Sequence, residues 1–581
     1  MKAAEIIAWI HSKLSFQTLF LLIFVVALLV RLWALDLKLF HHDEAVHAWF
    51  SYRLLTDGIY VYDPSYHGPF LYYVTAGMFA ILGASDPVGR ILPALFGVAL
   101  IPMVYAIYRL GYLDQRQTLV AALFIAISPE MVYFSRFLRQ DIFQLAFTLL
   151  LLVALLYYHR SGKLWYAALA GLSAGLGMTL KEDMPLLLLI FLVYGVYLLW
   201  SGKISLPRSW KRDAILAFLI FAGSMVLFYS SFGAHPEVIL GQVLNPGFIA
   251  KNGILSAINQ TGWYQAVEHW TAMHTQCRIC GPWFFYTILL ILYELPIFAL
   301  AILGTLQFTM KKSSGSCILD RIWKKKEEPT FAQIVEKVRG KEKRMVGNRK
   351  EEFIRFSIIW MLATLTIYAY IGEKVPWLIV HQLLPMIFVA TYLMTSRKAA
   401  FAVISSIFLI LVLWHVAFVS ADVSEPIVQV QNSEELRTVM ALIDASDSVA
   451  ISSDTYWPLP WYYRGEAAKK IQYFGRLLPR DTLASMDVDL IITYDADSYD
   501  SIPGFAKRTY RINYWFSYYD NENRLLEYYF LRDGKLGSMN FDVFIRITNL
   551  TAEPFRDTVS YGISPLVSLE TNPATCFTSV Y

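Results

Sequence analysis

The chain has 581 residues, of which 56% are hydrophobic, 15% are aromatic and only 17% are charged. A chain of this length, with so few charged residues and with its apolar residues in long runs, is not a single soluble globule. The formal net charge of +4 comes mostly from Lys and Arg in loops between those runs, so it indicates membrane topology and argues against a nucleic-acid partner.

Long apolar runs divide the first 420 residues. A helix needs roughly 18 to 25 apolar residues to cross a hydrocarbon core of about 30 Å, and we count about eleven such runs. They lie near residues 15–35, 87–108, 117–134, 141–158, 164–180, 184–200, 214–232, 283–309, 354–371, 377–395 and 399–420. The sequence therefore predicts a mostly α-helical, polytopic membrane domain over residues 1–420.

Lys and Arg gather in every second loop, and positive residues in short loops stay in the cytoplasm. The basic loops lie near 109–116, 160–163, 203–212, 310–353 and 397–398. This pattern predicts a multi-pass protein of the cell membrane with a cytoplasmic N-terminus. The long basic loop is expected to lie in the cytoplasm near anionic membrane lipids, and the C-terminal domain is expected outside.

The first extracytoplasmic loop, residues 36–86, carries unusual polar residues. It opens with "FHHDEAVH" (40–47), which combines three histidines and two carboxylates at the mouth of the first apolar run. Helical spacing of apolar residues predicts an interfacial helix that ends at "DG" (57–58). Pro69 is expected to begin a second interfacial helix, so that the two helices frame "YHGP" (66–69).

The second span begins with "SDP" (85–87), a helix cap followed by a first-turn proline, and this places Arg90 at its outer end. Such an arginine can anchor the span by reaching lipid headgroups, or it can hold a phosphate through two parallel hydrogen bonds. The sequence alone leaves both roles open.

More ionisable residues stand at the same outer face. Arg136 and Arg139 are three residues apart, so they are expected to share a face of the helix that opens the fourth span, and Asp141 at the same end is expected to orient one of them. "KEDMP" (181–185) and "GEKVPWLIVH" (372–381) join them. Ionisable residues at span ends are costly unless they bind something, so these motifs predict a shared site. Taken singly, each could instead be a solvated loop residue or an interfacial anchor.

The acidic pair, the His-Gly-Pro tripeptide and the arginines together resemble a known superfamily. The arrangement is similar to that of the GT-C membrane glycosyltransferases, which include the dolichyl-phosphate-mannose protein mannosyltransferases. It resembles most closely the archaeal and bacterial flippase-activity-associated glycosylation proteins. The marks of that family correspond here to Asp43-Glu44, His67-Gly68-Pro69, Arg90, and either Arg136 or Arg139.

The resemblance implies a GT-C-type helical bundle that transfers a hexosyl or pentosyl group from a polyprenyl (dolichyl) phosphate. The acceptor would be a hydroxyl on a glycan, lipid or protein at the extracytoplasmic face of a prokaryotic, archaeal cell. Such chemistry needs a carboxylate to take the acceptor's proton and cations to stabilise the leaving phosphate.

Asp43 is the predicted base, and Glu44 is its structural or acceptor-orienting partner. The predicted donor-phosphate ligands are Arg90, Arg136, Arg139, His67, Lys181 and Lys374. The predicted acceptor-binding or site-shaping residues are His42, His47, Tyr66, Asp141, Glu182 and His381.

Metal use is left open by the sequence. Asp43 and Glu44 together could bind Mg²⁺ or Mn²⁺, although no motif spacing fixes such a site and no cofactor is certain. The outer loop 233–282 contains a second candidate, a tetrahedral zinc site, whose two cysteines could equally form a disulfide. Its potential ligands are His269, His274, Cys277 and Cys280.

The composition changes after residue 420. "SEELRTVMALIDA" has helical spacing, whereas "SVAISSD", "DVDLIITYD" and "FDVFIRITN" have the pattern of short buried strands. Residues 421–581 are therefore predicted to form an extracytoplasmic α/β domain.

A second class of function remains open. A transporter or flippase-associated protein for lipid-linked glycans would need no transfer chemistry. Broken spans in paired repeats would favour it, and no internal repeat is visible in the sequence.

Overall fold

The structure is a computed structural model that describes residues 15–58, 60–276, 281–314, 331–420 and 422–549. The chain divides into two compact units, each with a hydrophobic core of its own. Among the described residues, the first unit takes those that fall within Met1–Asp36, Phe50–Thr275 and Gly281–Val419. The second unit takes the described residues within Leu37–Trp49, Gln276–Cys280 and Ser420–Tyr581.

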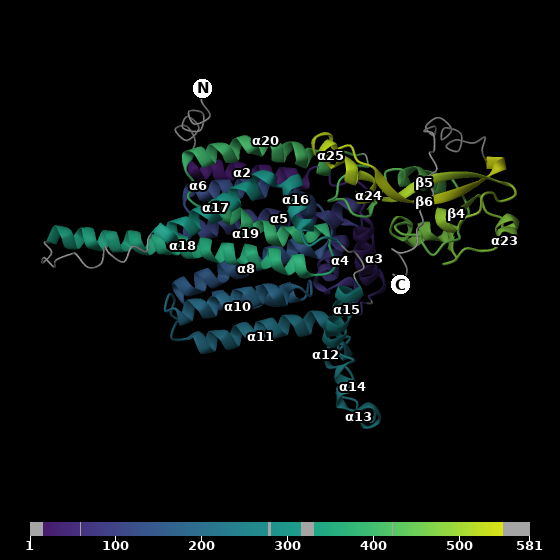
Figure 1. The fold of residues 1–581 in the computed structure, drawn as a ribbon. Helices are drawn as coiled ribbons and strands as arrows, with labels where there is room; N and C mark the ends of the chain where they lie inside the picture. Colours follow the sequence, from purple (N-terminus) through teal and green to yellow (C-terminus); the bar gives the residue numbers. More distant parts are fainter. Residues whose placement is uncertain (1–14, 59, 277–280, 315–330, 421, 550–581) are drawn as a thin grey trace. The chain divides into compact units, whose positions relative to one another are not determined.

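The first unit is a bundle of helices (Figure 1). Its main helices are α2 (Phe16–Leu32), α4 (Phe70–Leu82), α5 (Asp86–Arg109), α6 (Gln115–Ile127), α7 (Pro129–Ser135), α8 (Gln140–Ser161), α9 (Leu164–Met178), α10 (Met184–Trp200), α11 (Trp210–Tyr229), α16 (Phe285–Tyr293), α17 (Leu295–Ser314), α18 (Phe331–Tyr370), α19 (Ile379–Ala390) and α20 (Ser396–Phe418). Between α11 and α16 lie α12 (Glu237–Leu240), α13 (Pro246–Asn252), α14 (Ile254–Ile258) and α15 (Gly262–Gln276). Helix α3 (His42–Asp57) and α4 occupy the two helical stretches predicted for the first loop.

Within the described ranges, five helices are long and apolar enough to cross a membrane, and two bent helix pairs raise that number to seven. The five are α5, α8, α11, α20 and the Arg349–Tyr370 part of α18. Helices α2, α9, α10 and α19 are apolar but shorter, and they occupy four further predicted spans. The chain is a multi-pass membrane protein, and the count of eleven spans stays a prediction.

Two spans that the sequence predicted as continuous, 117–134 and 283–309, are bent. Helices α6 and α7 meet at 56° next to Ser128, and α16 and α17 meet at 112° next to Glu294. Pro129, the first residue of α7, disfavours helical geometry in Ser128, and Pro296 lies in the first turn of α17, where its missing N–H costs no helix hydrogen bond. The breaks contact each other, because Glu294 Oε1 accepts hydrogen bonds from Ser128 Oγ at 2.5 Å and from Glu130 N–H at 3.0 Å.

Helix α8 is buried over most of its length between α5 and α9. Helix α9 in turn packs closely on α11. A Cβ at Gly171 of α9 would lie 2.2 Å from Ala217 O of α11, so this approach requires glycine. This close packing holds α9 in place, and the turn after its last residue carries the predicted site residues of 181–183.

The second unit is a six-stranded mixed sheet, in the order β1-β5-β6-β4-β2-β3. The strands are β1 (Gln431–Asn432), β2 (Val449–Ile451), β3 (Ile471–Tyr473), β4 (Leu490–Tyr494), β5 (Phe505–Phe516) and β6 (Leu536–Arg546). Strand β2 pairs in parallel with β3 and β4, and the remaining pairs are antiparallel. Helix α21 (Leu436–Asp444) packs its apolar side chains on this sheet, which confirms the predicted α/β domain. Its extracytoplasmic location stays a prediction.

Residues 37–49 group with the C-terminal residues. Phe40 N–H donates to Tyr462 Oη at 3.0 Å, and Asn432 Nδ2 donates to Phe40 O at 2.6 Å. The Leu39 side chain belongs to the core of the second unit. A domain boundary at residue 420 alone, as the sequence suggested, therefore leaves out the start of α3.

Candidate active site

The predicted site residues of the first unit come from helix ends. His67 precedes α4, Arg90 lies in the second turn of α5, and Asp141 is the second residue of α8. Lys181 follows α9, and His381 lies in the first turn of α19. Helices that run up and down a bundle return their alternate ends to one side, and the contacts below bring most of these residues together.

The His-Gly-Pro tripeptide, residues 67–69, is held against the turn after α9. Gly68 N–H donates to Leu180 O at 3.0 Å, and Phe70 N–H donates to Thr179 O at 3.0 Å. A Cβ on Gly68 would lie 2.2 Å from Thr179 O, so a side chain at this position would push the turn away. The glycine of the motif thus serves to dock two loops.

His67 has a φ of 66°, which residues other than glycine rarely adopt. This backbone conformation accompanies a contact of 2.7 Å between His67 Nδ1 and Glu182 Oε2. Tyr62 Oη donates to the other carboxylate oxygen of Glu182 at 3.2 Å. The imidazole also stacks on the Trp270 ring, with 4.7 Å between centroids. Two of the predicted residues, His67 and Glu182, therefore form one contact pair.

Asp141 is the centre of a buried ionic cluster. Lys181 Nζ lies 2.6 Å from its Oδ1, Arg139 Nε lies 3.4 Å from its Oδ2, and His381 Nε2 lies 3.7 Å from Oδ1. The Arg139 guanidinium also lies over the Trp377 ring, 3.7 Å from the centroid. All five side chains are buried. A buried carboxylate is stabilised by such cations, and guanidinium and ammonium groups in this setting also suit a phosphate.

Asp183 completes the Lys-Glu-Asp turn, residues 181–183. Its carboxylate accepts hydrogen bonds from Gln144 Nε2 at 2.6 Å and from Tyr368 Oη at 2.7 Å. Gln144 belongs to α8 and Tyr368 to α18, so this residue joins two helices. Each of the three consecutive side chains therefore has a different partner.

Arg136 and Arg139 do not share a helix face, and that prediction is wrong. Arg136 follows the last residue of α7 and Arg139 precedes α8, so a non-helical turn separates them. Spacing of i,i+3 implies a shared face only on a continuous helix. Arg136 instead closes the end of α2, where its guanidinium donates to four main-chain oxygens at 2.6–3.2 Å. They belong to Val30, Arg31, Trp33 and Ala34.

Lys374 and Arg90 also donate to main-chain oxygens. Lys374 Nζ donates to three carbonyl groups at the end of α18, and burial lowers its pKa. Arg90 Nη1 donates to Leu35 O at 2.8 Å. Lys374 thus satisfies carbonyl groups at the end of α18, and Arg90 contacts the turn that follows α2. The roles of both residues as phosphate ligands stay predictions.

Asp43 and Glu44 lie in the second unit, in the first turn of α3. His41 caps this helix, because its Nδ1 accepts a hydrogen bond from Asp43 N–H at 3.1 Å. The ring proton is then on Nε2, which donates to Gln429 O. Glu44 Oε2 accepts from His41 N–H at 2.8 Å, as in a capping box. Burial lowers the pKa of His41 and so favours the neutral ring that both contacts need.

The remaining predicted residues are divided between the two units. His42 and His47 are in α3, within the part that groups with the second unit, and His47 is buried. Tyr66 belongs to the first unit, where its main-chain oxygen accepts hydrogen bonds from Tyr72 Oη at 2.7 Å and Gln140 Nε2 at 3.3 Å. Tyr66 therefore ties α4 to the start of α8.

Among the described residues, no group of three or more His, Cys, Asp or Glu side chains is arranged to hold a metal ion. One carboxylate oxygen of Glu44 accepts the hydrogen bond of the helix cap. The binding of Mg²⁺ or Mn²⁺ by Asp43 and Glu44 stays a prediction. Of the predicted zinc ligands, His274 accepts a hydrogen bond from Gly372 N–H at 2.9 Å, and His269 packs edge-on against Trp270. Cys277 and Cys280 lie outside the described residues.

Sequence reasoning missed two buried charged residues, one inside a helix and one at a helix break. Arg31, inside the apolar α2, donates to Ile125 O at 2.6 Å and to Ser135 Oγ at 3.1 Å. Glu294 accepts from the start of α7, as described above. Each is a single charge within an apolar run, and such charges in membrane spans usually have a specific partner. That signal was available in the sequence.

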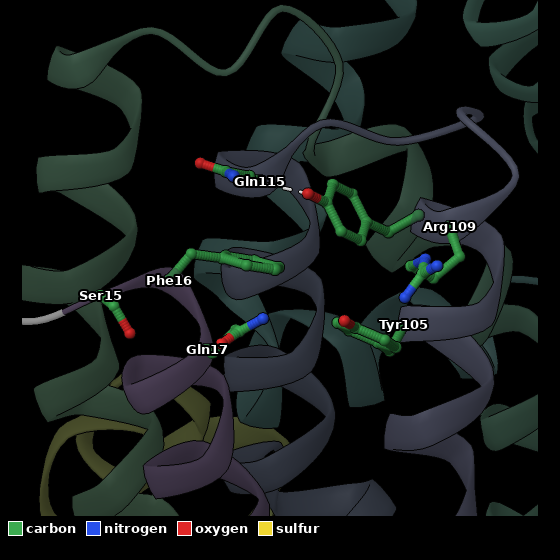
Figure 2. Close-up of a pocket in the computed structure, with 7 residues that line it drawn as sticks. Ser15, Phe16, Gln17, Tyr105, Arg109 and Gln115 are labelled. Atoms are coloured by element: carbon green, nitrogen blue, oxygen red, sulfur yellow. Dashed lines mark hydrogen bonds between the residues drawn. The ribbon is translucent and has the colours of Figure 1, made fainter.

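A cavity of about 360 Å³ lies at the other end of α5 (Figure 2). Arg109 in its lining is 19 residues from Arg90, which corresponds to roughly 30 Å along the helix. Ser15, Phe16 and Gln17 from the start of α2, Tyr105 and Tyr108 from α5, and Gln115 from α6 complete the lining. This cavity is separate from the cluster around Asp141.

Comparisons with known proteins agree with this geometry. Residues 66–229, which include His67, Arg90, Asp141 and Lys181, match the family model described as dolichyl-phosphate-mannose-protein mannosyltransferase. No curated protein matches the chain. Among solved structures, the chain is similar to ArnT from Cupriavidus metallidurans bound to undecaprenyl phosphate. The TM-score is 0.52 at 14% sequence identity, and the match covers 82% of this chain and 93% of that chain.

Two other structures are more distant. The Archaeoglobus fulgidus oligosaccharyltransferase, in complex with Zn and sulfate, has a TM-score of 0.47 and 13% identity over 82% of this chain and 68% of its own. The S. cerevisiae protein O-mannosyltransferase complex bound to the sugar donor has a TM-score of 0.33 and 18% identity over 38% of this chain and 33% of its own. The chain has the fold of the GT-C membrane glycosyltransferases, as its sequence predicted. The closer likeness to the flippase-associated family stays a prediction.

Proposed function

We propose that this chain is an integral membrane glycosyltransferase that moves a sugar from a polyprenyl phosphate to an acceptor hydroxyl. The observation that carries the proposal is the convergence of Lys181 and Arg139 on Asp141 at one end of a bundle with the GT-C fold. The family match over 66–229 and the fold shared with an undecaprenyl-phosphate-bound protein support it.

Lys181 and Arg139 are the proposed ligands of the donor phosphate. An ammonium carries three N–H donors and a guanidinium five, so each can keep its contact with Asp141 and still donate to a phosphate oxygen. Asp141 and the Trp377 ring fix the direction of these donors. His67, held by Glu182, is the third proposed donor. Arg90, Arg136 and Lys374 stay predicted ligands only, because each already donates to main-chain oxygens near a helix end.

The proposed reaction exchanges one bond at the anomeric carbon. The acceptor oxygen forms a bond to that carbon, the bond from the carbon to the phosphate oxygen breaks, and the polyprenyl phosphate leaves with the electron pair. Asp43 takes the acceptor's proton. Cations aimed at the leaving phosphate stabilise the charge that develops there. The support for Asp43 is its match to the first residue of the family's acidic pair, together with the use of Glu44 in the helix cap.

The finer features of the proposal come from the resemblance. The transferred group would be a hexose or a pentose, the acceptor a glycan, lipid or protein, and the reaction would occur at the extracytoplasmic face. The proposal uses no metal ion. If Mg²⁺ or Mn²⁺ takes part, Asp43 and Glu44 are its expected ligands, and it would supply a further positive charge next to the phosphate.

The test uses the full-length chain in detergent with a panel of polyprenyl-phosphate sugars, and it measures the release of polyprenyl phosphate. We expect release with at least one sugar, and we expect Lys181→Met to abolish it. Gly77→Ala is the control, because a Cβ at Gly77 meets no atom within 4 Å. Movement of a lipid-linked glycan across vesicles without any release of polyprenyl phosphate would favour the transporter alternative instead.

A further inference from the structure

The three parallel strands of the second unit create an edge that has no role in the proposed transfer. In the sheet, β2 lies between β3 and β4. The chain runs from β2 to its neighbour β3 and then crosses over β2 to form β4 on the opposite side. The strands are in parallel register, with Val449 opposite both Ile471 and Leu490. In open α/β sheets, ligands bind outside the carboxyl ends of the strands at the point where the strand order reverses. Here that point lies between β2 and β4.

A crevice of about 380 Å³ occupies this position. Its lining consists of the residues that follow the three strands: Ser452, Ser453 and Asp454 after β2; Gly475, Arg476 and Leu477 after β3; and Tyr494 and Asp497 at the end of β4. Small-molecule sites typically have volumes of roughly 300–1,000 Å³, and the point where the strand order reverses is one of their preferred positions. The crevice lies wholly within the second unit, so it does not depend on the cluster around Asp141.

The walls of the crevice are held by side-chain hydrogen bonds. Ser452 Oγ accepts from Leu478 N–H at 2.7 Å and donates to Arg476 O at 3.2 Å, which ties the loop after β3 to the end of β2. Ser453 Oγ accepts from Thr455 N–H at 2.9 Å. The backbone is therefore fixed, whereas the side chains of Arg476 and Asp497 are exposed. A preformed backbone with exposed polar groups is what a binding site needs, since little order is lost on binding.

The charge of the crevice limits its ligand. Asp454, Asp495 and Asp497 lie close to Tyr494, where burial and these carboxylates together raise the pKa of the phenol. Arg476 is the single cation in the lining. An excess of carboxylates disfavours a phosphate or another anion. Among the described residues, no set of three or more potential metal ligands is arranged around a common point, here or elsewhere.

A ligand rich in hydroxyl groups satisfies these conditions. Carboxylates accept hydrogen bonds from neighbouring hydroxyl groups, and a guanidinium donates to ring or hydroxyl oxygens. The Tyr494 ring offers an apolar surface with a polar edge, suited to the mixed faces of a sugar ring. We propose that the crevice between β2 and β4 binds one sugar residue of a glycan, through Asp454, Asp497, Arg476 and Tyr494. This goes beyond the transfer reaction, because it assigns a separate carbohydrate site to the C-terminal unit.

The test measures binding to the full-length chain in detergent by saturation-transfer NMR. The probes are the methyl glycosides of mannose, glucose, galactose and N-acetylglucosamine. We expect saturable binding of at least one probe. Asp497→Asn and Arg476→Gln should each weaken it about tenfold, because each removes a charged hydrogen-bond partner. Asp487→Asn, at a fully exposed carboxylate outside the crevice, should leave the affinity unchanged.

Two further measurements separate this site from the transfer site and from a cation site. Asp141→Asn should lose transfer and keep the binding of the methyl glycoside, so the failure of one proposal is distinguishable from the failure of the other. Ca²⁺ is titrated in parallel with the sugars. The proposal is overturned if no probe saturates, if the crevice variants bind as the wild type does, or if only Ca²⁺ binds.

Discussion

Lys181 Nζ lies 2.6 Å from Asp141 Oδ1, and this contact joins the turn after α9 to the start of α8. Both side chains are buried, and Arg139 and His381 approach the same carboxylate. The contact therefore has two consequences that can be separated by experiment. It stabilises the bundle end, and it orients a cation toward the proposed phosphate.

The stability of the pair is tested by Lys181→Met and Asp141→Asn. Removing one partner of a buried ion pair costs roughly 3–5 kcal/mol, and we expect the lower end here because Arg139 remains beside Asp141. The double variant should be more stable than the sum of the two single effects predicts, because neither partner is left alone. Thermal unfolding in detergent measures this, with transfer assayed in parallel. Transfer should stay lost in the double variant. Strictly additive effects on stability would show that the two residues do not interact.

The sequence predicted the parts of the fold that depend on local pattern. Runs of apolar residues located the helices. Pro69 marked the start of α4 and "DG" (57–58) marked the end of α3, each to within one residue. The sequence did not predict the bends at Ser128 and Glu294, because a proline in an apolar run can either begin a new helix or kink an existing one. In the structure the two breaks contact each other through Glu294.

The candidate site was predictable by residue type and less so by role. The His-Gly-Pro and Lys-Glu-Asp motifs were both identified, but their mutual contact is long-range and depends on the packing of α9 against α11. Arg136 shows the limit most clearly. Its spacing from Arg139 suggested a common helix face, whereas the helix ends after Ser135 and the guanidinium closes α2 instead. Spacing carries no information about where a helix stops.

Gly68→Ala should displace the Lys-Glu-Asp turn, because the new Cβ would lie 2.2 Å from Thr179 O. Displacement of catalytic groups by about 1 Å can reduce a rate roughly 100-fold, and we expect a loss of that order in transfer. Gly77→Ala in α4 is the matched control. It has open space around it, and alanine within a helix is more stable than glycine by about 0.5–1 kcal/mol. Equal activity of the two variants would mean that the docking of the tripeptide does not position the site.

His41 should make the start of α3 sensitive to acid. Burial lowers the pKa of His41 below the ordinary value of 6.5, and the nearby His42 lowers it further. The charges of Asp43 and Glu44 raise this pKa and so offset part of the lowering. The unfolded chain then binds more protons than the folded chain, so the contribution of His41 to stability is complete above about pH 6.5 and is lost as the pH falls below that value. The hydrogen-exchange protection factor at β1, which is the intrinsic exchange rate at each pH divided by the observed rate, should report this loss between pH 8 and pH 5.

The control for that experiment is His41→Asn, which keeps a good helix cap without a titrating ring. We expect the protection factor at β1 to depend much less on pH in this variant, with a remainder from His42, whose pKa is also lowered by burial. His42→Gln should retain most of the pH dependence of the wild type, and a loss of pH dependence in this variant would assign the effect to His42 instead.

Asp43→Asn should collapse sugar transfer while the donor still binds. A general base contributes roughly 10²- to 10⁴-fold to a rate, and asparagine keeps the shape of the side chain without its basicity. The backbone N–H of residue 43 still donates to His41 Nδ1 in this variant, so the helix cap should be retained.

Glu44→Gln tests the other carboxylate. Glutamine can still accept from His41 N–H, so this variant should lose little transfer if Glu44 serves the cap alone. The deciding measurement is transfer together with donor binding in one detergent preparation. Transfer at the wild-type rate in Asp43→Asn would remove its catalytic role, whereas an equal fall in donor binding would identify Asp43 as a ligand of a metal ion or of the donor.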